Sequence, residues 1–254
     1  MYLPRVCVAA SRESALITIQ NEIGALSRGA ATMKFLCVPA SLRDYLAMLV
    51  TDFIPAKETE SRRLMILLHG LGDSMEGYRW APEALQLPGF NYLFVNAPDA
   101  YYGGFSWYDF ASLPAPGIKR SRELLFKLLD DLRGKGFPTE QTVVFGFSQG
   151  CLMTIEVGLR YPHLLAGLVC VSGYAHESEK LMKELSPVAK QQRFLVTHGT
   201  QDPLIPFQKV KEQVKLFQAN GVQMEWREFH KAHTIAGEEE ISVIRNFICS
   251  CFEK

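Results

Sequence analysis

The pentapeptide Gly146-Phe-Ser-Gln-Gly150 is the strongest indication of the fold in this sequence. It follows an apolar, β-rich run at residues 141–145 and precedes a helical pattern at residues 152–159. Gly-x-Ser-x-Gly between a strand and a helix is typical of a sharp turn that strains the serine backbone and projects its hydroxyl out of a sheet. A side chain two residues before or after the serine would collide with such a turn, which explains both glycines. Ser148 is therefore a candidate nucleophile.

Strand-like runs alternate with helical patterns on both sides of this turn. Strands are predicted at residues 46–53, 63–68, 91–95, 141–145, 165–171, 193–198 and 222–229. Helices are predicted at residues 121–133, 152–159, 210–218 and 238–252. Repeated strand–helix units indicate parallel strands joined by crossovers, but the first two strands are too close for a crossover and are expected to form an antiparallel hairpin. The pattern predicts an α/β fold with a mostly parallel central sheet and helices on both faces.

Composition excludes several classes of protein. The 254 residues are 48% hydrophobic, and 27 basic residues balance 27 acidic ones, so nothing favours a nucleic-acid partner. No apolar run reaches the roughly 18–20 residues of a membrane span, and Glu13 and Glu22 interrupt any secretory leader. We expect a cytoplasmic protein without a transmembrane segment, with an N-terminal extension at residues 1–32 and one domain at residues 33–254. A net charge of zero also permits a homodimer.

The six cysteines indicate neither a disulfide framework nor a metal site. They are scattered through a long chain that carries no secretory leader, so they are interpreted as reduced thiols. Cys249-Ser-Cys251 lacks a second pair of ligands and is expected to lie at the end of the last helix. No metal is predicted, and chemistry on a serine nucleophile requires no cofactor.

One acidic residue stands in the place that a catalytic acid requires. Asp202 lies in a loop directly after the predicted strand at residues 193–198, and functional groups gather beyond the carboxyl ends of parallel strands. The other acidic residues that follow Ser148 fall in predicted helices, in a charged surface loop or within a strand. Asp202 is therefore the predicted acid.

The base should follow the acid in the chain, which leaves His230 and His233. Both lie in the loop between the last strand and the last helix. His230 is nearer the strand, where packing could occupy its ring, so position favours His233 only modestly. The earlier histidines have other predicted roles: His163 and His176 are expected to be solvated and His198 to be structural.

A glycine-rich turn follows another predicted strand. His69-Gly-Leu-Gly-Asp73 can offer a backbone N–H, most simply that of Leu71, to a developing oxyanion. A second N–H is expected from Gln149, at the start of the helix after Ser148, where helix N–H groups are unpaired. The turn lacks the Gly-Lys-Ser/Thr ending of a phosphate-binding loop.

Together these motifs resemble the phospholipase/carboxylesterase family of α/β-hydrolases, which includes acyl-protein thioesterases and small bacterial carboxylesterases. The resemblance runs from about residue 64 to residue 252. Its landmarks are His69-Gly-Leu-Gly-Asp73, Asn96-Ala-Pro98, Ser106-Trp-Tyr-Asp109, Gly146-Phe-Ser-Gln-Gly150, Ser172-Gly-Tyr174, His198-Gly-Thr-Gln-Asp202 and His233-Thr-Ile235. The turn after Asp73 and the short loop before Trp107 are more similar to the bacterial branch.

The resemblance implies the α/β-hydrolase fold and a catalytic triad of Ser148, Asp202 and His233, and it settles His233 over His230. It also implies an oxyanion hole made by the N–H groups of Leu71 and Gln149. The implied activity is that of a serine carboxylesterase acting on small-molecule esters with short to medium acyl chains. The alternatives are an acyl-protein thioesterase, a lysophospholipase, and a catalytically silent member that only binds ligands.

Aromatic residues cluster in two loops beside the expected site. Trp80, Phe105 and Trp107 are predicted to contact substrate, because aromatic-lined pockets suit acyl chains and aromatic esters. The alternative is that Trp80 and Trp107 are core residues that anchor the loops.

Overall fold

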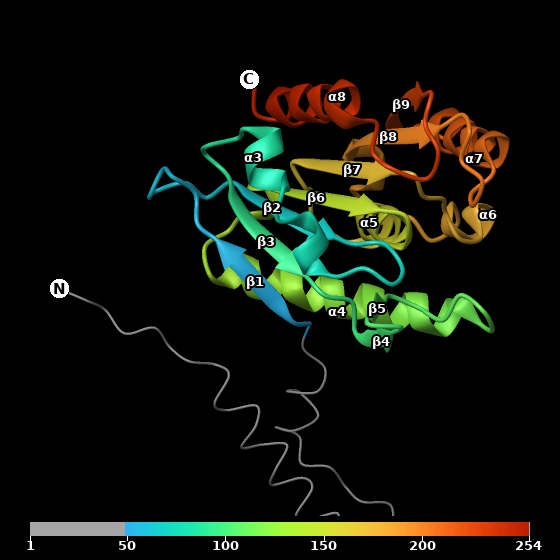
Figure 1. Cartoon of the computed structure of the whole chain (residues 1–254), viewed down its shortest axis with the longest axis horizontal. Coiled ribbons are helices and arrows are strands. Elements are labelled where there is room, and N and C mark those ends of the chain that lie inside the picture. The colour runs from blue at the N-terminus through green and yellow to red at the C-terminus, as the bar shows by residue number, and fades with distance from the viewer. Residues whose placement is uncertain (1–48, 254) are drawn as a thin grey trace, which may run out of the picture. The chain divides into compact units, whose positions relative to one another are not determined.

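A computed structural model describes residues 49–253. The predicted boundary between residues 32 and 33 lies outside the described residues. Figure 1 shows a central sheet with helices on both of its faces. The strands are β1 (Thr51–Ile54), β2 (Leu64–Leu68), β3 (Asn91–Val95), β4 (Asp99–Tyr101), β5 (Gly104–Ser106), β6 (Thr142–Phe147), β7 (Gly167–Val171), β8 (Arg193–Gly199) and β9 (Gln223–Phe229). The α-helices are α3 (Ala81–Leu85), α4 (Pro114–Gly134), α5 (Gln149–Arg160), α6 (Ser178–Leu181), α7 (Phe207–Ala219) and α8 (Gly237–Ser250).

Seven of the strands form one sheet in the order β1-β3-β2-β6-β7-β8-β9. All neighbours in this sheet are parallel except β1 and β3, which are antiparallel and place Thr51 opposite Val95. The predicted mostly parallel sheet is therefore confirmed. Strands β4 and β5 form a separate two-stranded hairpin that the sequence did not reveal.

The predicted hairpin between the first two strands is wrong. β2 pairs with β3 on one side and with β6 on the other, so no edge of β2 remains for β1. All five residues of β2 are buried, which fits a central strand, whereas β1 alternates between exposed and half-buried residues and lies at the sheet edge. Residues 46–48 of the predicted first strand lie outside the described part of the chain.

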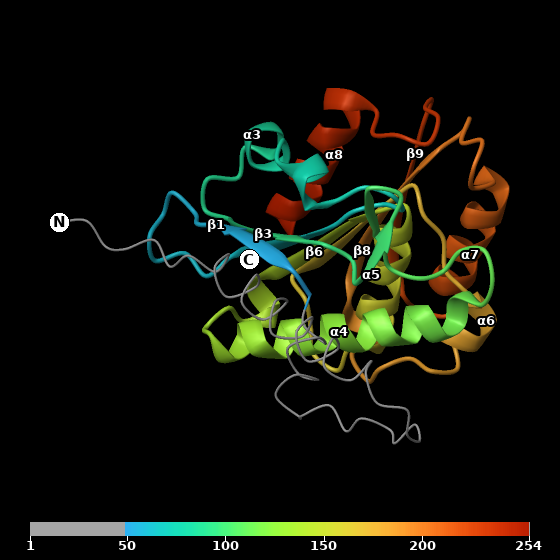
Figure 2. The same cartoon turned by 60° about the horizontal axis from the view of Figure 1, so that its bottom comes forward.

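The core has two halves, one on each face of the sheet. Alternate residues of β2 point to opposite faces: Leu64, Ile66 and Leu68 pack in one half, and Met65 and Leu67 in the other. Helices α4, α5 and α7 cover the first face, and α3 and α8 cover the second (Figures 1 and 2). The predicted two-sided covering is confirmed.

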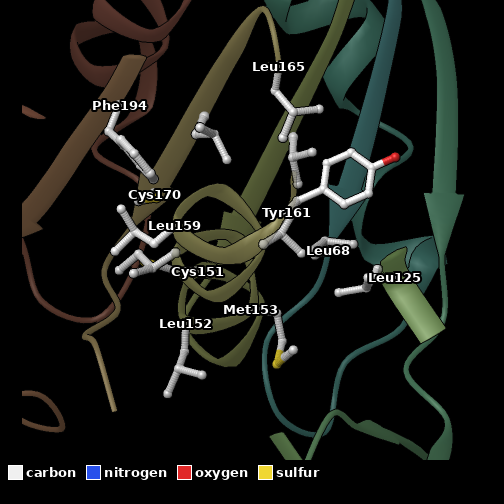
Figure 3. Packing of buried hydrophobic residues seen from close by; sticks show 14 of the residues in the cluster. Leu68, Leu125, Cys151, Leu152, Met153, Leu159, Tyr161, Leu165, Cys170 and Phe194 are labelled. Atoms are coloured by element: carbon white, nitrogen blue, oxygen red, sulfur yellow. The ribbon is translucent and has the colours of Figure 1, made fainter. Parts of the chain in front are cut away.

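Helix α5 follows the candidate nucleophile and is the most deeply buried of these helices. Figure 3 shows its apolar side chains packed against the neighbouring strands, with Leu159 and Cys151 near Cys170 and Phe194. A Cβ on Gly158 would lie 2.6 Å from the Phe194 ring, so the helix can approach the sheet this closely only with glycine there. This packing fixes the start of α5, and with it the position of residue 148.

No helix within residues 49–253 has the length and apolar composition needed to span a membrane.

Candidate active site

Three side chains from distant parts of the sequence meet at the carboxyl ends of the strands. His233 Nε2 lies 2.9 Å from Ser148 Oγ, and His233 Nδ1 lies 2.7 Å from Asp202 Oδ2. Ser148 follows β6, Asp202 follows β8 and His233 follows β9. An ionised carboxylate only accepts hydrogen bonds, so Nδ1 carries the proton and Nε2 is left to accept the Ser148 O–H. This arrangement can withdraw a proton from the serine hydroxyl.

The backbone at Ser148 has the geometry predicted for the turn. Its φ of 53° and ψ of −114° lie in a region that residues with side chains rarely adopt. A Cβ on Gly146 would lie 2.1 Å from the carbonyl oxygen of Gly150, and a Cβ on Gly150 would lie 2.1 Å from that of Leu68. Both glycines are therefore required by close backbone approach, as the sequence predicted.

The carboxylate of Asp202 is buried, and both of its oxygens accept hydrogen bonds. Its Oδ1 accepts the backbone N–H groups of Leu204 and Ile205, each at 2.9 Å, while Oδ2 accepts from His233. Burial raises the pKa of Asp202, but the hydrogen bonds from Ile205, His233 and Leu204 outweigh it and leave the pKa below its ordinary value. Asp202 is therefore ionised near neutral pH and can hold the imidazole in one orientation.

The glycine-rich turn after β2 is held by its buried first residue, His69, a role that the sequence did not reveal. His69 Nε2 accepts the backbone N–H of Ala97 at 3.0 Å, so Nδ1 donates to the carbonyl of Gly70 at 2.6 Å. Burial lowers the pKa of His69 despite this hydrogen bond and the nearby charge of Asp73, so the ring stays neutral. The signal in the sequence was its position at the end of an entirely apolar strand.

The β4–β5 hairpin holds the same turn from the other side. The N–H of Gly72 donates to the carbonyl of Phe105, and the N–H of Phe105 donates to the carbonyl of Asp73, both at 2.9 Å. A Cβ on Gly104 would lie 2.1 Å from the carbonyl oxygen of Gly72, so this approach depends on glycine. The turn that carries Leu71 is thus fixed before any ligand arrives.

Gln149 has a second role that the sequence did not reveal. Its side-chain Oε1 accepts the N–H of Trp107 at 3.0 Å, and its Nε2 donates to the carbonyl of Tyr108 at 3.1 Å. The residue after Ser148 therefore ties the start of α5 to the loop after β5. Leu71, Ser148 and Gln149 line one hollow of about 460 Å³.

The other histidines lie where they cannot contact Ser148. His198 is fully buried behind the acid, with Nε2 3.0 Å from the carbonyl oxygen of Ile205 and 3.7 Å from Asp202 Oδ2. His230 is exposed. His163 and His176, which were expected to be solvated, are half-buried. The ring of His163 makes an edge-to-face contact with Tyr161, and His176 Nε2 lies 3.8 Å from Glu177 Oε2.

The three aromatic residues predicted to contact substrate take different positions. Trp80 lines a second hollow, of about 630 Å³, next to His233. Trp107 is fully buried and donates its Nε1–H to the carbonyl of His69 at 2.9 Å, so it supports the turn instead of facing a substrate. Phe105 packs against the core and the His69 ring, and it lines neither hollow.

In the part of the chain that the structure describes, no three His, Cys, Asp or Glu side chains lie close enough together to hold a metal ion. The four cysteines within residues 49–253 are free, and burial holds the pKa of Cys170 well above its ordinary value, so it is an inert thiol. Cys7 and Cys37 lie outside the described residues.

The sheet, the strained turn and the hydrogen-bonded side chains define an α/β-hydrolase. Residues 50–252 match the model of the phospholipase/carboxylesterase family. The chain belongs to this family of ester-hydrolysing enzymes, as the sequence motifs indicated.

Individual relatives agree with this assignment. The chain is 34% identical to acyl-protein thioesterase 1 of Schizosaccharomyces pombe over 155 residues, which cover 56% of this chain and 69% of the relative. It is 28% identical to a probable carboxylesterase of Oryza sativa subsp. japonica over 229 residues, or 82% of this chain and 86% of the relative. The crystal structure of esterase PE8 superposes with a TM-score of 0.71 at 25% identity and covers 81% of this chain and 100% of its own.

Proposed function

We propose that the protein is a serine carboxylesterase that hydrolyses small carboxylic esters through an acyl-enzyme on Ser148. The observation that carries this proposal is the continuous chain of hydrogen bonds from Ser148 through His233 to Asp202. The ionised Asp202 keeps the proton of the imidazole on Nδ1 and stabilises the imidazolium that forms during the reaction.

The reaction has two halves. In the first, His233 Nε2 takes the hydroxyl proton of Ser148 while Oγ bonds to the acyl carbon, and the carbonyl oxygen becomes an oxyanion. The N–H groups of Leu71 and Gln149 stabilise this charge, each by roughly 3 kcal/mol in the transition state. The bond to the leaving group then breaks, and His233 returns the proton to it. In the second half, His233 takes a proton from water while the water oxygen bonds to the acyl carbon; the bond to Ser148 Oγ then breaks, His233 returns the proton to Oγ, and the carboxylic acid is released.

The walls of the Ser148 hollow support an apolar acyl group. Among residues 49–253, its lining includes one carboxylate, Asp73, and no lysine or arginine, and most of the remaining side chains are aromatic or aliphatic: Tyr101, Tyr108, Phe110, Tyr174 and Leu204. Such a hollow accepts an uncharged chain by burying its surface. We propose short to medium acyl chains.

The second candidate activity is that of an acyl-protein thioesterase. It is favoured by the similarity to acyl-protein thioesterase 1 of Schizosaccharomyces pombe. A thioester would react through the same groups, because only the leaving atom differs. A lysophospholipase would act in the same way on a long acyl chain, whereas a ligand-binding protein without catalysis would leave Ser148 unacylated.

A series of p-nitrophenyl esters from acetyl to palmitoyl tests the proposal. We expect kcat/KM to peak at a short or medium chain, and we expect Ser148→Ala to lower it by about 10⁴-fold or more. A peak at palmitoyl, together with faster release of palmitate from an S-acylated peptide than from its O-ester analogue, would favour the thioesterase. Equal rates for the protein and Ser148→Ala would overturn the serine mechanism.

Two broader proposals accompany this function: a cytoplasmic location and a homodimer. Fractionation of cells that express the tagged chain tests the first, and sedimentation equilibrium of the purified protein tests the second.

A further inference from the structure

Two hollows meet at His233 and share one wall. The hollow described above contains Ser148 and the two residues proposed to donate to the oxyanion. The second, of about 630 Å³, contains neither Ser148 nor those donors, and it is lined by His233, Thr234, Ile235 and Trp80. Asp73, Phe147 and His233 line both hollows.

Acyl transfer requires the acyl chain and the leaving group of the substrate to lie in different places. The acyl carbonyl must lie between Ser148 Oγ and the oxyanion donors, which places the acyl chain in the first hollow. The leaving group must receive its proton from His233 Nε2, so it lies on the side of the imidazole. We propose that the second hollow binds the alcohol or thiol part of the substrate, and that it selects bulky leaving groups that are uncharged or cationic over anionic ones. This inference rests on the proposed function.

The apolar part of the second hollow explains the preference for bulk. Trp80 and Phe147 both line it, and the ring centroid of the buried Tyr78 lies 6.2 Å from that of Trp80. Phe147 in turn contacts the His233 ring at 5.0 Å between centroids. We expect a large leaving group attached near His233 to bury more of this apolar lining than a methyl group does.

The charged residues that line the second hollow explain why we expect cationic leaving groups to be preferred over anionic ones. The carboxylates that line this hollow are Asp73 and Glu238, and no lysine or arginine of the described part of the chain lines it. Glu238 pairs with Arg245 at 3.0 Å, and Asp73 accepts the backbone N–H of Ser74 at 2.7 Å. Aromatic faces and a carboxylate favour a cation, and the carboxylate repels an anion.

Four butyrate esters with one acyl group and different alcohols test the inference: methyl, phenyl, 3-(trimethylammonio)phenyl and 3-sulfophenyl butyrate. Each variant is compared with the unaltered protein on the same ester, so intrinsic differences between leaving groups cancel. We expect Trp80→Ala to lower kcat/KM for phenyl butyrate at least about fivefold more than for methyl butyrate, and Trp80→Phe to restore most of this difference. Tyr102→Ala removes an aromatic ring that is 95% exposed and lines neither hollow, so it should leave the ratio between the two esters unchanged.

The charge preference has its own variant. Asp73→Asn should raise kcat/KM for the sulfophenyl ester and lower it for the trimethylammonio ester, which changes their ratio by about threefold, and salt should reduce the effect. Equal losses on methyl and phenyl esters in Trp80→Ala, or an unchanged ratio of charged esters in Asp73→Asn, would overturn the inference and leave the proposed function intact. If the unaltered protein hydrolyses none of the four esters, the proposed function fails and this inference fails with it.

Discussion

At the scale of the residue, the two histidines that follow Asp202 have different surroundings. His233 contacts Ser148 and Asp202 and has a side chain that is 13% exposed, whereas His230 is exposed and contacts neither. We therefore expect His233→Ala to lower kcat by about 10³-fold or more and His230→Ala to change it by no more than about twofold. Steady-state hydrolysis of p-nitrophenyl butyrate measures both. The reverse order of the two losses would show that the base has been assigned to the wrong residue.

The sequence could predict which residues of the site lie near the ends of strands, but not where every side chain points. Ser148 and Asp202 followed from their positions directly after predicted strands, and the structure brings them together through His233. Position alone favoured His233 only modestly, because the course of the loop after β9, which bends at His230 and again at residues 232–234, is not specified by local sequence. Trp107 looked equally suited to a pocket or a core, and only the tertiary packing places it fully inside.

At the scale of the element, the loop that carries His233 is attached to helix α8 by a buried ion pair. Lys231 Nζ lies 2.6 and 2.7 Å from the two carboxylate oxygens of Glu240, and the side chains are 3% and 0% exposed. Glu240 also accepts the N–H of Ala236 at 2.7 Å, and the carbonyl of Lys231 accepts the N–H of Gln201 at 3.2 Å. The pair therefore connects the loops that carry His233 and Asp202 to the start of α8.

Removal of one partner should cost stability, because the other charge stays buried without compensation. We expect Lys231→Met or Glu240→Gln to lower the free energy of unfolding by about 3–5 kcal/mol, and the double variant Lys231→Met/Glu240→Leu to recover much of it. If the pair also orients His233, the double variant should still show a kcat reduced by about tenfold with little change in KM. Urea unfolding and ester hydrolysis measure the two effects.

The matched control is another lysine–glutamate pair in the same chain. Lys211 and Glu228 lie 3.2 Å apart with side chains that are 32% and 46% exposed, so Lys211→Met should cost less than about 1 kcal/mol. Similar losses in both single variants would contradict the argument from burial. A double variant with normal kcat would show that the pair contributes to stability alone.

At the scale of the whole molecule, the sheet brings together loops that are far apart in the chain. The three residues of the proposed triad follow β6, β8 and β9, which lie within one block of the sheet, and the glycine-rich turn follows β2, which lies beside β6. Alternation of strands and helices was enough to predict this parallel block. It could not predict that β1 pairs with β3 instead of β2, because the pairing of an edge strand depends on which central strand has a free edge. The short β4–β5 hairpin was missed for a similar reason: its residues are stabilised by the turn they contact.

Labelling with a fluorophosphonate tests whether Ser148 is the nucleophile, because the reagent reacts with a serine only when a base activates it. We expect peptide mass spectrometry to find one adduct, on Ser148, formed in step with the loss of esterase activity and strongly slowed in His233→Ala. An active enzyme that stays unlabelled at Ser148, or a Ser148→Ala variant that keeps its esterase activity, would contradict it.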